Sequence, residues 1–158
     1  MTRAIALAIA CVCLASCGGV DKARFDAVYK AGRALQQEVE SSKGMPHSQS
    51  RDLLKRFDTE IAALSGHTIG KREADALGFY TDAADAYRAF LRFRGLALEA
   101  ENHQIPVKGP DLETATKYKL PIDSRGGSKV VNSEQAITIL LQASEQHLSD
   151  GNRLVNGQ

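Results

Sequence analysis

The chain of 158 residues has no tryptophan, and its only three cysteines lie within the first seventeen positions. Residues 18–158 therefore cannot form a disulfide, so their stability must come from a packed core. The chain also lacks an excess of either charge, with 20 Lys and Arg against 19 Asp and Glu. A neutral chain without tryptophan has no electrostatic footprint for nucleic acid, and we expect no nucleic-acid partner.

The first residues combine one positive charge, Arg3, with an apolar run from Ala4 to Leu14 that ends in small residues. This is the pattern of a secretory signal peptide. The uncharged stretch is at the lower limit of the roughly 17–25 residues that span a bilayer, so a retained membrane helix is the weaker interpretation. Cleavage after Ala15, releasing a soluble periplasmic protein, is a second alternative. We expect a signal peptide over residues 1–16.

The sequence Leu14-Ala15-Ser16-Cys17 resembles the lipobox of bacterial lipoproteins. The resemblance covers residues 1–19 only, and residues 20–158 resemble no family that we recognise. In lipoproteins the cysteine sulfur receives a diacylglycerol, cleavage falls just before it, and the new amino terminus is acylated. The resemblance therefore implies lipid attachment at Cys17 and a lipidated tether over residues 17–20, with no other cofactor.

Lipid on this cysteine implies a particular place for the protein. Three acyl chains would hold it on a membrane essentially permanently, anchored rather than spanning. In the lipoprotein family an aspartate after the cysteine commonly marks the inner membrane, and Gly18 stands there instead. The resemblance thus implies the bacterial cell envelope, at the outer membrane and facing the periplasm.

Residues 21–150 contain apolar residues at spacings of three and four, which is typical of amphipathic helices. The pattern predicts four of them, over residues 21–43, 48–65, 73–103 and 132–148. Gly151 and Asn152 are expected to end the last helix and to leave a flexible tail over 151–158. The prediction is an all-α single domain of residues 21–150, resembling a four-helix bundle.

The third predicted helix has two apolar stripes, which together cover about 200° of its surface. A helix with such a wide apolar arc packs against neighbours on two sides. Its aromatic residues Tyr80, Tyr87 and Phe90 form core or, alternatively, line a slot for a small apolar ligand. Arg94 interrupts the arc; we expect it to satisfy the last carbonyls of the first helix near Gly44, with ligand binding as the alternative.

The 28 residues from 104 to 131 contain three of the four prolines and predict a long irregular connection inside the domain. Residues 111–119 after Pro110 are expected to form a short helix, and Arg125-Gly126-Gly127-Ser128 a turn. Connections of this length are uncommon in compact domains and are often functional. A functional segment and a mere crossover remain equally open.

Motifs for catalysis or metal binding are missing from the sequence. No Gly-x-Ser-x-Gly elbow and no Cys-x-x-Cys-His motif occurs. The Glu-x-x-His motif of di-iron bundles is absent too, because Ala100 and Ser144 precede His103 and His147 at that offset. We therefore expect no metal site and no catalytic residues.

These observations favour a non-enzymatic envelope lipoprotein with an accessory, scaffolding or interaction role at the periplasmic face of the membrane. Its partners would be the membrane, through the lipid, and another envelope protein. The alternative is a helical module that binds a small apolar ligand or lipid. A cell-wall hydrolase is a third hypothesis, which only the location suggests. The sequence leaves the oligomeric state open.

Overall fold

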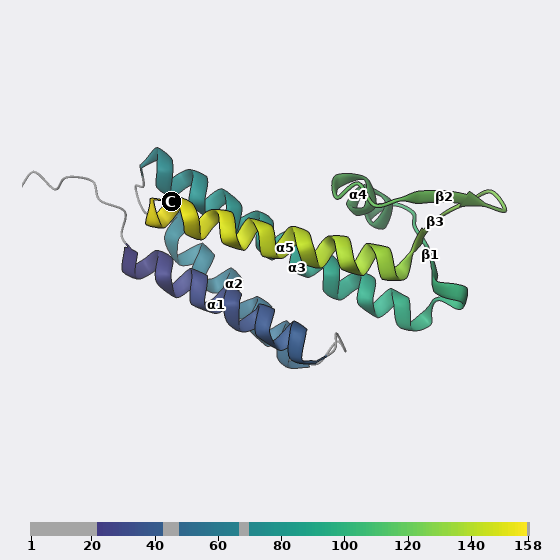
Figure 1. The fold of residues 1–158 in the computed structure, drawn as a ribbon, viewed down its shortest axis with the longest axis horizontal. Coiled ribbons are helices and arrows are strands. Elements are labelled where there is room, and N and C mark those ends of the chain that lie inside the picture. Colours follow the sequence, from purple (N-terminus) through teal and green to yellow (C-terminus); the bar gives the residue numbers. More distant parts are fainter. Residues whose placement is uncertain (1–21, 43–47, 67–69, 158) are drawn as a thin grey trace, which may run out of the picture.

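The computed structural model describes residues 22–42, 48–66 and 70–157, and these residues are mostly α-helical. Figure 1 shows a small sheet and one short helix gathered at one end of the long helices. The helices are α1 (Lys22–Ser41), α2 (Ser48–Ser65), α3 (Lys71–Glu99), α4 (Pro110–Lys117) and α5 (Ser133–Asn156). After a 3-10 turn come strands β1 (Gln104–Pro106), β2 (Ile122–Arg125) and β3 (Ser128–Asn132).

The first two helices follow their apolar stripes. The bounds predicted for α2 are confirmed, and α1 ends at Ser41, within the predicted range. Each helix buries one face, which includes one fully buried aromatic residue, Phe25 in α1 and Phe57 in α2. The two helices make extensive contact with each other.

Helix α3 packs on two sides, as its wide apolar arc predicts. It contacts α5 most extensively and α2 on another side, and its middle is lined with buried alanines that allow close approach. Its predicted end at His103 is wrong, because the helix stops at Glu99. Asn102 and His103 have positive φ angles of 51° and 57°, a conformation that ends a helix.

Helix α5 begins as predicted, since the side chain of Asn132 accepts a hydrogen bond of 3.0 Å from the backbone N–H of Gln135. Its predicted end at Gly151, and with it a flexible tail over residues 151–156, is wrong. The helix continues to Asn156, and Val155 is buried. Gly151 has a packing role instead, because a Cβ built there would lie 3.0 Å from Cε1 of Tyr80.

The connection over residues 104–131 is ordered, which corrects the prediction of an irregular segment. The expected short helix is α4, and the expected turn joins β2 to β3, where Gly126 and Gly127 have φ angles of 55° and 82°. The sheet has the order β1-β3-β2, with both pairs antiparallel. Strand β1 therefore pairs with a strand more than twenty residues further along the chain, and local sequence patterns do not reveal such a pairing.

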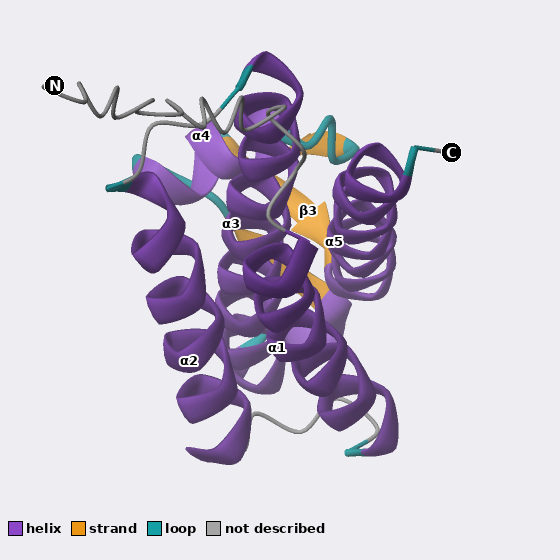
Figure 2. Cartoon of the chain, turned by 90° about the vertical axis from the view of Figure 1, so that its left-hand side faces the viewer, coloured by secondary structure: helices purple, strands orange, loops and turns teal. Residues whose placement is uncertain are grey.

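One continuous core joins the helices to this connection. It contains aromatic residues of α1, α2 and α3, and it also includes Ile105 of β1, Ala115 of α4 and Val131 of β3. Figure 2 shows the long helices side by side, with strands behind them. Helix α5 runs antiparallel to α3, since the Arg72 side chain at the start of α3 donates a hydrogen bond of 2.6 Å to the carbonyl of Leu154.

Candidate functional site

The predicted ligand-binding aromatic residues lie in the core. Tyr80 and Tyr87 are 0% exposed and Phe90 is 1% exposed. The Tyr80 ring packs 6.2 Å from the ring of Phe25, measured between centroids, and closely against Gly151. Burial raises the pKa of both tyrosines above the ordinary value. Side chains packed in this way fill the space between helices, so the geometry favours the interpretation as core.

The other predicted site residues are placed less directly. Cys17, the expected lipid attachment site, lies outside the described residues. Arg94 is partly buried in α3, and this burial lowers the pKa of its guanidinium. Gly44, the position near which we expected Arg94 to cap the first helix, also lies outside the described residues. The capping role therefore stays a prediction.

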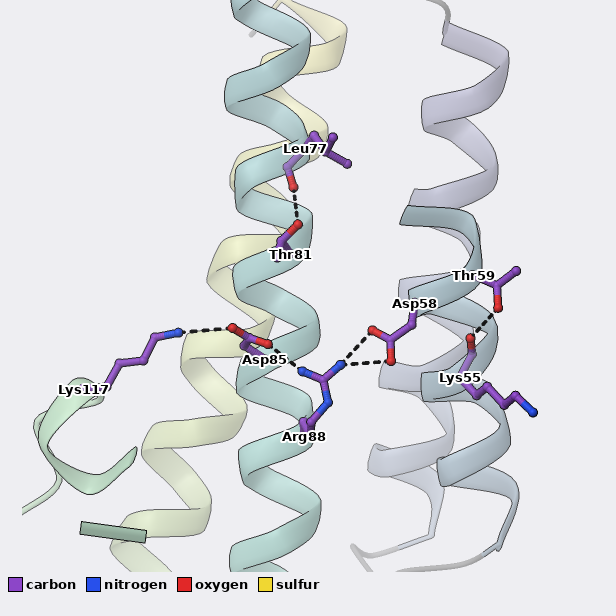
Figure 3. A network of polar contacts seen from close by, with 8 residues as sticks. All are labelled: Lys55, Asp58, Thr59, Leu77, Thr81, Asp85, Arg88 and Lys117. Atoms are coloured by element: carbon purple, nitrogen blue, oxygen red, sulfur yellow. Dashed lines mark hydrogen bonds and ion pairs between the residues drawn. The ribbon is translucent and has the colours of Figure 1, made fainter. Parts of the chain in front are cut away.

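A chain of charged side chains links α2, α3 and α4 on one face of the domain (Figure 3). Arg88 of α3 donates to both carboxylate oxygens of Asp58 at 2.9 Å, and it also donates to Asp85. Asp85 in turn accepts a hydrogen bond of 3.3 Å from Lys117 of α4. Arg88 and Asp85 lie three residues apart on α3, so their pairing could be expected from sequence. The contacts with Asp58 and Lys117 were missed, because these residues are distant in sequence and meet α3 only in the fold.

A second ion pair joins α3 and α4. Arg92 of α3 donates to both carboxylate oxygens of Asp111, a residue in the first turn of α4. This hydrogen bonding raises the pKa of Arg92. The two contacts hold α4 against α3 from the side that faces solvent.

A cavity of about 270 Å³ lies between α3 and α4, next to these ion pairs. The basic side chains that line it are Arg88, Arg92 and Lys117. Each is paired with a carboxylate, from Asp58, Asp82, Asp85 or Asp111. The cavity thus has no uncompensated positive charge to attract an anion. Exposed pairs of this kind each stabilise a fold by at most about 1 kcal/mol. We assign the pairs of Lys117 and Asp111 to the positioning of α4, and the Arg88–Asp58 pair to the packing of α2 on α3.

The two histidines that the structure describes, His103 and His147, do not belong to a cluster of potential metal ligands. No three His, Cys, Asp or Glu side chains in residues 22–42, 48–66 and 70–157 lie close enough to hold a metal ion. His103 lies 3.8 Å from a carboxylate oxygen of Glu134, while His147 packs beside Phe79. His47 and His67 lie outside the described residues.

In the hairpin of β2 and β3, one strand is exposed along its whole length. All four residues of β2 are exposed, whereas Val130 and Val131 of β3 are buried. In Figure 1 the hairpin projects past the ends of the long helices. A signal for it exists in the sequence, because two glycines precede a β-branched pair, but β2 itself has no alternation of apolar and polar residues.

No helix in the described part of the chain is both long and apolar enough to cross a membrane. Comparisons with protein-family models, with curated proteins and with solved structures found no match.

Proposed function

We propose that the protein is a lipid-anchored lipoprotein of the bacterial envelope, with a non-enzymatic accessory or interaction role on the periplasmic side of the outer membrane. The observation that carries the proposal is the sequence Leu14-Ala15-Ser16-Cys17 after an apolar run. Lipid on Cys17 makes the membrane its first partner, and the second is another envelope protein.

The arrangement of the domain supports an interaction role for the sheet and α4. Four residues separate Cys17 from Lys22, the first residue of α1, and five fully extended residue steps span at most about 18 Å. The start of α1 lies at the opposite end of the long helices from the sheet (Figure 1). The 29 residues of α3 extend about 43 Å between these ends. With a lipid at Cys17, the sheet and α4 would be the parts of the domain that can lie furthest from the bilayer.

The four long helices support a finer proposal about architecture. Contacts connect α1 with α2, α2 with α3, α3 with α5, and α5 with α1, which closes a ring. We infer that these helices act as one four-helix bundle, a rigid support for the sheet at its end.

The alternative functions have less support. A slot for an apolar ligand or lipid needs space around Tyr80 and Tyr87, and both side chains are fully buried. A hydrolase needs two converging acids, and the carboxylates of the network in Figure 3 are each paired with Arg88 or Lys117. The interaction role requires neither feature.

A position-dependent crosslinking experiment tests the interaction role. A photoreactive residue is placed at Lys119, which is exposed between α4 and β2, in cells that express the full chain. The matched control carries it at Ala62, which is exposed on α2. We expect one envelope protein to crosslink in stoichiometric amount from position 119 and not from position 62. Equal capture from both positions, or none from either, would contradict the proposed role.

A further inference from the structure

Strand β2 leaves one edge of the sheet unpaired. It pairs with β3 on one side, and among the described residues no strand lies on its other side. All four of its residues are exposed, and the hairpin projects from the helices, so neighbouring elements do not cover this edge (Figure 1). An open edge is a template for another strand, and proteins commonly place charges there to discourage pairing.

The ladder determines which backbone groups of β2 face outward. Residues flanking a two-residue turn form a hydrogen-bonded pair, here Arg125 with Ser128, and bonded and non-bonded pairs then alternate. Ser124 therefore belongs to a non-bonded pair with Lys129. The carbonyl of Lys129 accepts a hydrogen bond of 2.9 Å from Val107, on the side of β1, which agrees with this assignment. The N–H and C=O of Ser124 and Ile122 consequently point to the free edge.

The charged side chains of β2 can form ion pairs with the same residues of a second molecule of this protein. Asp123 and Arg125 lie two residues apart, on the same face of β2 and on either side of Ser124. If a second β2 aligns antiparallel with its Ser124 opposite this one, each Asp123 lies opposite Arg125 of the second copy. Opposite charges in directly opposed positions stabilise strand pairing, and like charges destabilise it.

We propose that the protein self-associates through β2, in an antiparallel pair centred on Ser124, which joins two sheets into one of six strands. Ile122 is the other residue of β2 with outward backbone groups, so Ser124 can also pair in a register that places Ile122 of the second copy opposite it. In that register Asp123 lies opposite Asp123 of the second copy, and the two like charges destabilise the pairing. The charges therefore favour the pairing centred on Ser124. The proposal concerns the folded domain and does not depend on lipid at Cys17.

The association is expected to be weak and reversible. Stable interfaces bury about 1,200–2,000 Å² in total, and two strands of four residues bury less than this. Two cross-strand ion pairs of about 0.2–1 kcal/mol each change the association constant by about two- to thirtyfold. The appropriate measurement therefore compares variants over a concentration series.

Charge exchange between copies gives the sharper test. Asp123→Arg and Arg125→Asp each place like charges opposite one another, and sedimentation of the full chain in detergent should show association weakened about tenfold. A mixture of these two variants restores both opposite pairs, so it should associate at least as well as the unchanged protein. The exchanged double variant D123R/R125D should do so alone. If the mixture associates no better than either single variant, the proposal is wrong.

Disulfide formation tests the register. Antiparallel hydrogen-bonded pairs have Cα atoms about 5.5 Å apart, within the range that a disulfide bridges. Ser124→Cys should therefore give a crosslinked dimer under mild oxidation, well above the background of the unchanged chain. Ser128→Cys is the matched control, since it is exposed on β3 and away from the proposed axis. Equal dimer yield from both variants, or crosslinks from position 124 only to a different envelope protein, would overturn the proposal.

Discussion

Replacing Gly32 with alanine puts a methyl group at the point where α1, α2 and α5 meet. The new Cβ would lie 2.6 Å from Cδ1 of Leu148 and 3.1 Å from two ring carbons of Phe57. The end of a leucine side chain normally moves aside at little cost. Leu148 is only 1% exposed and Phe57 is fully buried, however, so a shift of either side chain disturbs the packing around it.

The expected magnitude follows from two opposing effects. Alanine is favoured over glycine by about 1 kcal/mol within a helix. Overpacking of a filled core costs about 1–3 kcal/mol. The G32A variant should therefore lose about 0–2 kcal/mol of stability, although its backbone gains from the change.

Gly78 provides the matched control in α3, because a Cβ built on it would have no atom of another described residue within 4 Å beyond the adjoining helix backbone. Gly78→Ala should increase the free energy of unfolding by about 0.5–1 kcal/mol. Thermal unfolding of the full chain, followed by far-ultraviolet circular dichroism, measures both variants. The two free energies differ by about 0.5–3 kcal/mol, so at about 3–4 °C per kcal/mol the melting temperatures should differ by roughly 2–12 °C, with G32A lower.

The sign of the Gly32 effect is the decisive result. If G32A stabilised the protein as much as Gly78→Ala does, Gly32 would not face Phe57 and Leu148. The packing of α1 against α2 and α5 would then be wrong, and with it the proposed four-helix bundle.

Three further predictions concern single side chains. Tyr80→Phe should stabilise the protein by about 1 kcal/mol in urea unfolding, because the buried Tyr80 hydroxyl has no hydrogen-bond partner among the described residues; a loss of stability would contradict this. Asn132→Ala should cost about 1 kcal/mol through loss of the cap of α5, whereas Asn132→Ser should retain most of it. Burial, and then Glu40, raise the pKa of Glu145 above its usual 4.5, so its ionisation destabilises the folded state as pH rises through that raised pKa. Glu145→Gln should therefore increase stability at pH 7 but not at pH 3, and equal effects at both values would refute the electrostatic cause.

The helices could be predicted from sequence because each buries its apolar stripe against a neighbour. The stripes of α1, α2 and α3 give the period and the buried face, and Asn132 marks the start of α5 through the capping preference of its side chain. Gly151 was misinterpreted, because a glycine that ends a helix and one that admits the Tyr80 ring look alike in sequence.

The sheet and the ion pairs between helices could not be predicted in the same way. Strand β1 has three residues and pairs with β3 across the whole of α4, so no local alternation reveals it. Arg88 meets Asp58 only because α2 packs beside α3, thirty residues away in sequence. Contacts of this kind depend on tertiary structure.

Mass spectrometry of the amino-terminal peptide from the mature protein, purified from membranes, tests the central claim most directly. The account predicts that this peptide begins at Cys17 and carries a diacylglycerol on sulfur and an acyl chain on its amino group. Replacement of Cys17 with serine should abolish both the lipid and the cleavage before position 17. A mature chain that begins elsewhere, or an unmodified Cys17, would contradict the account.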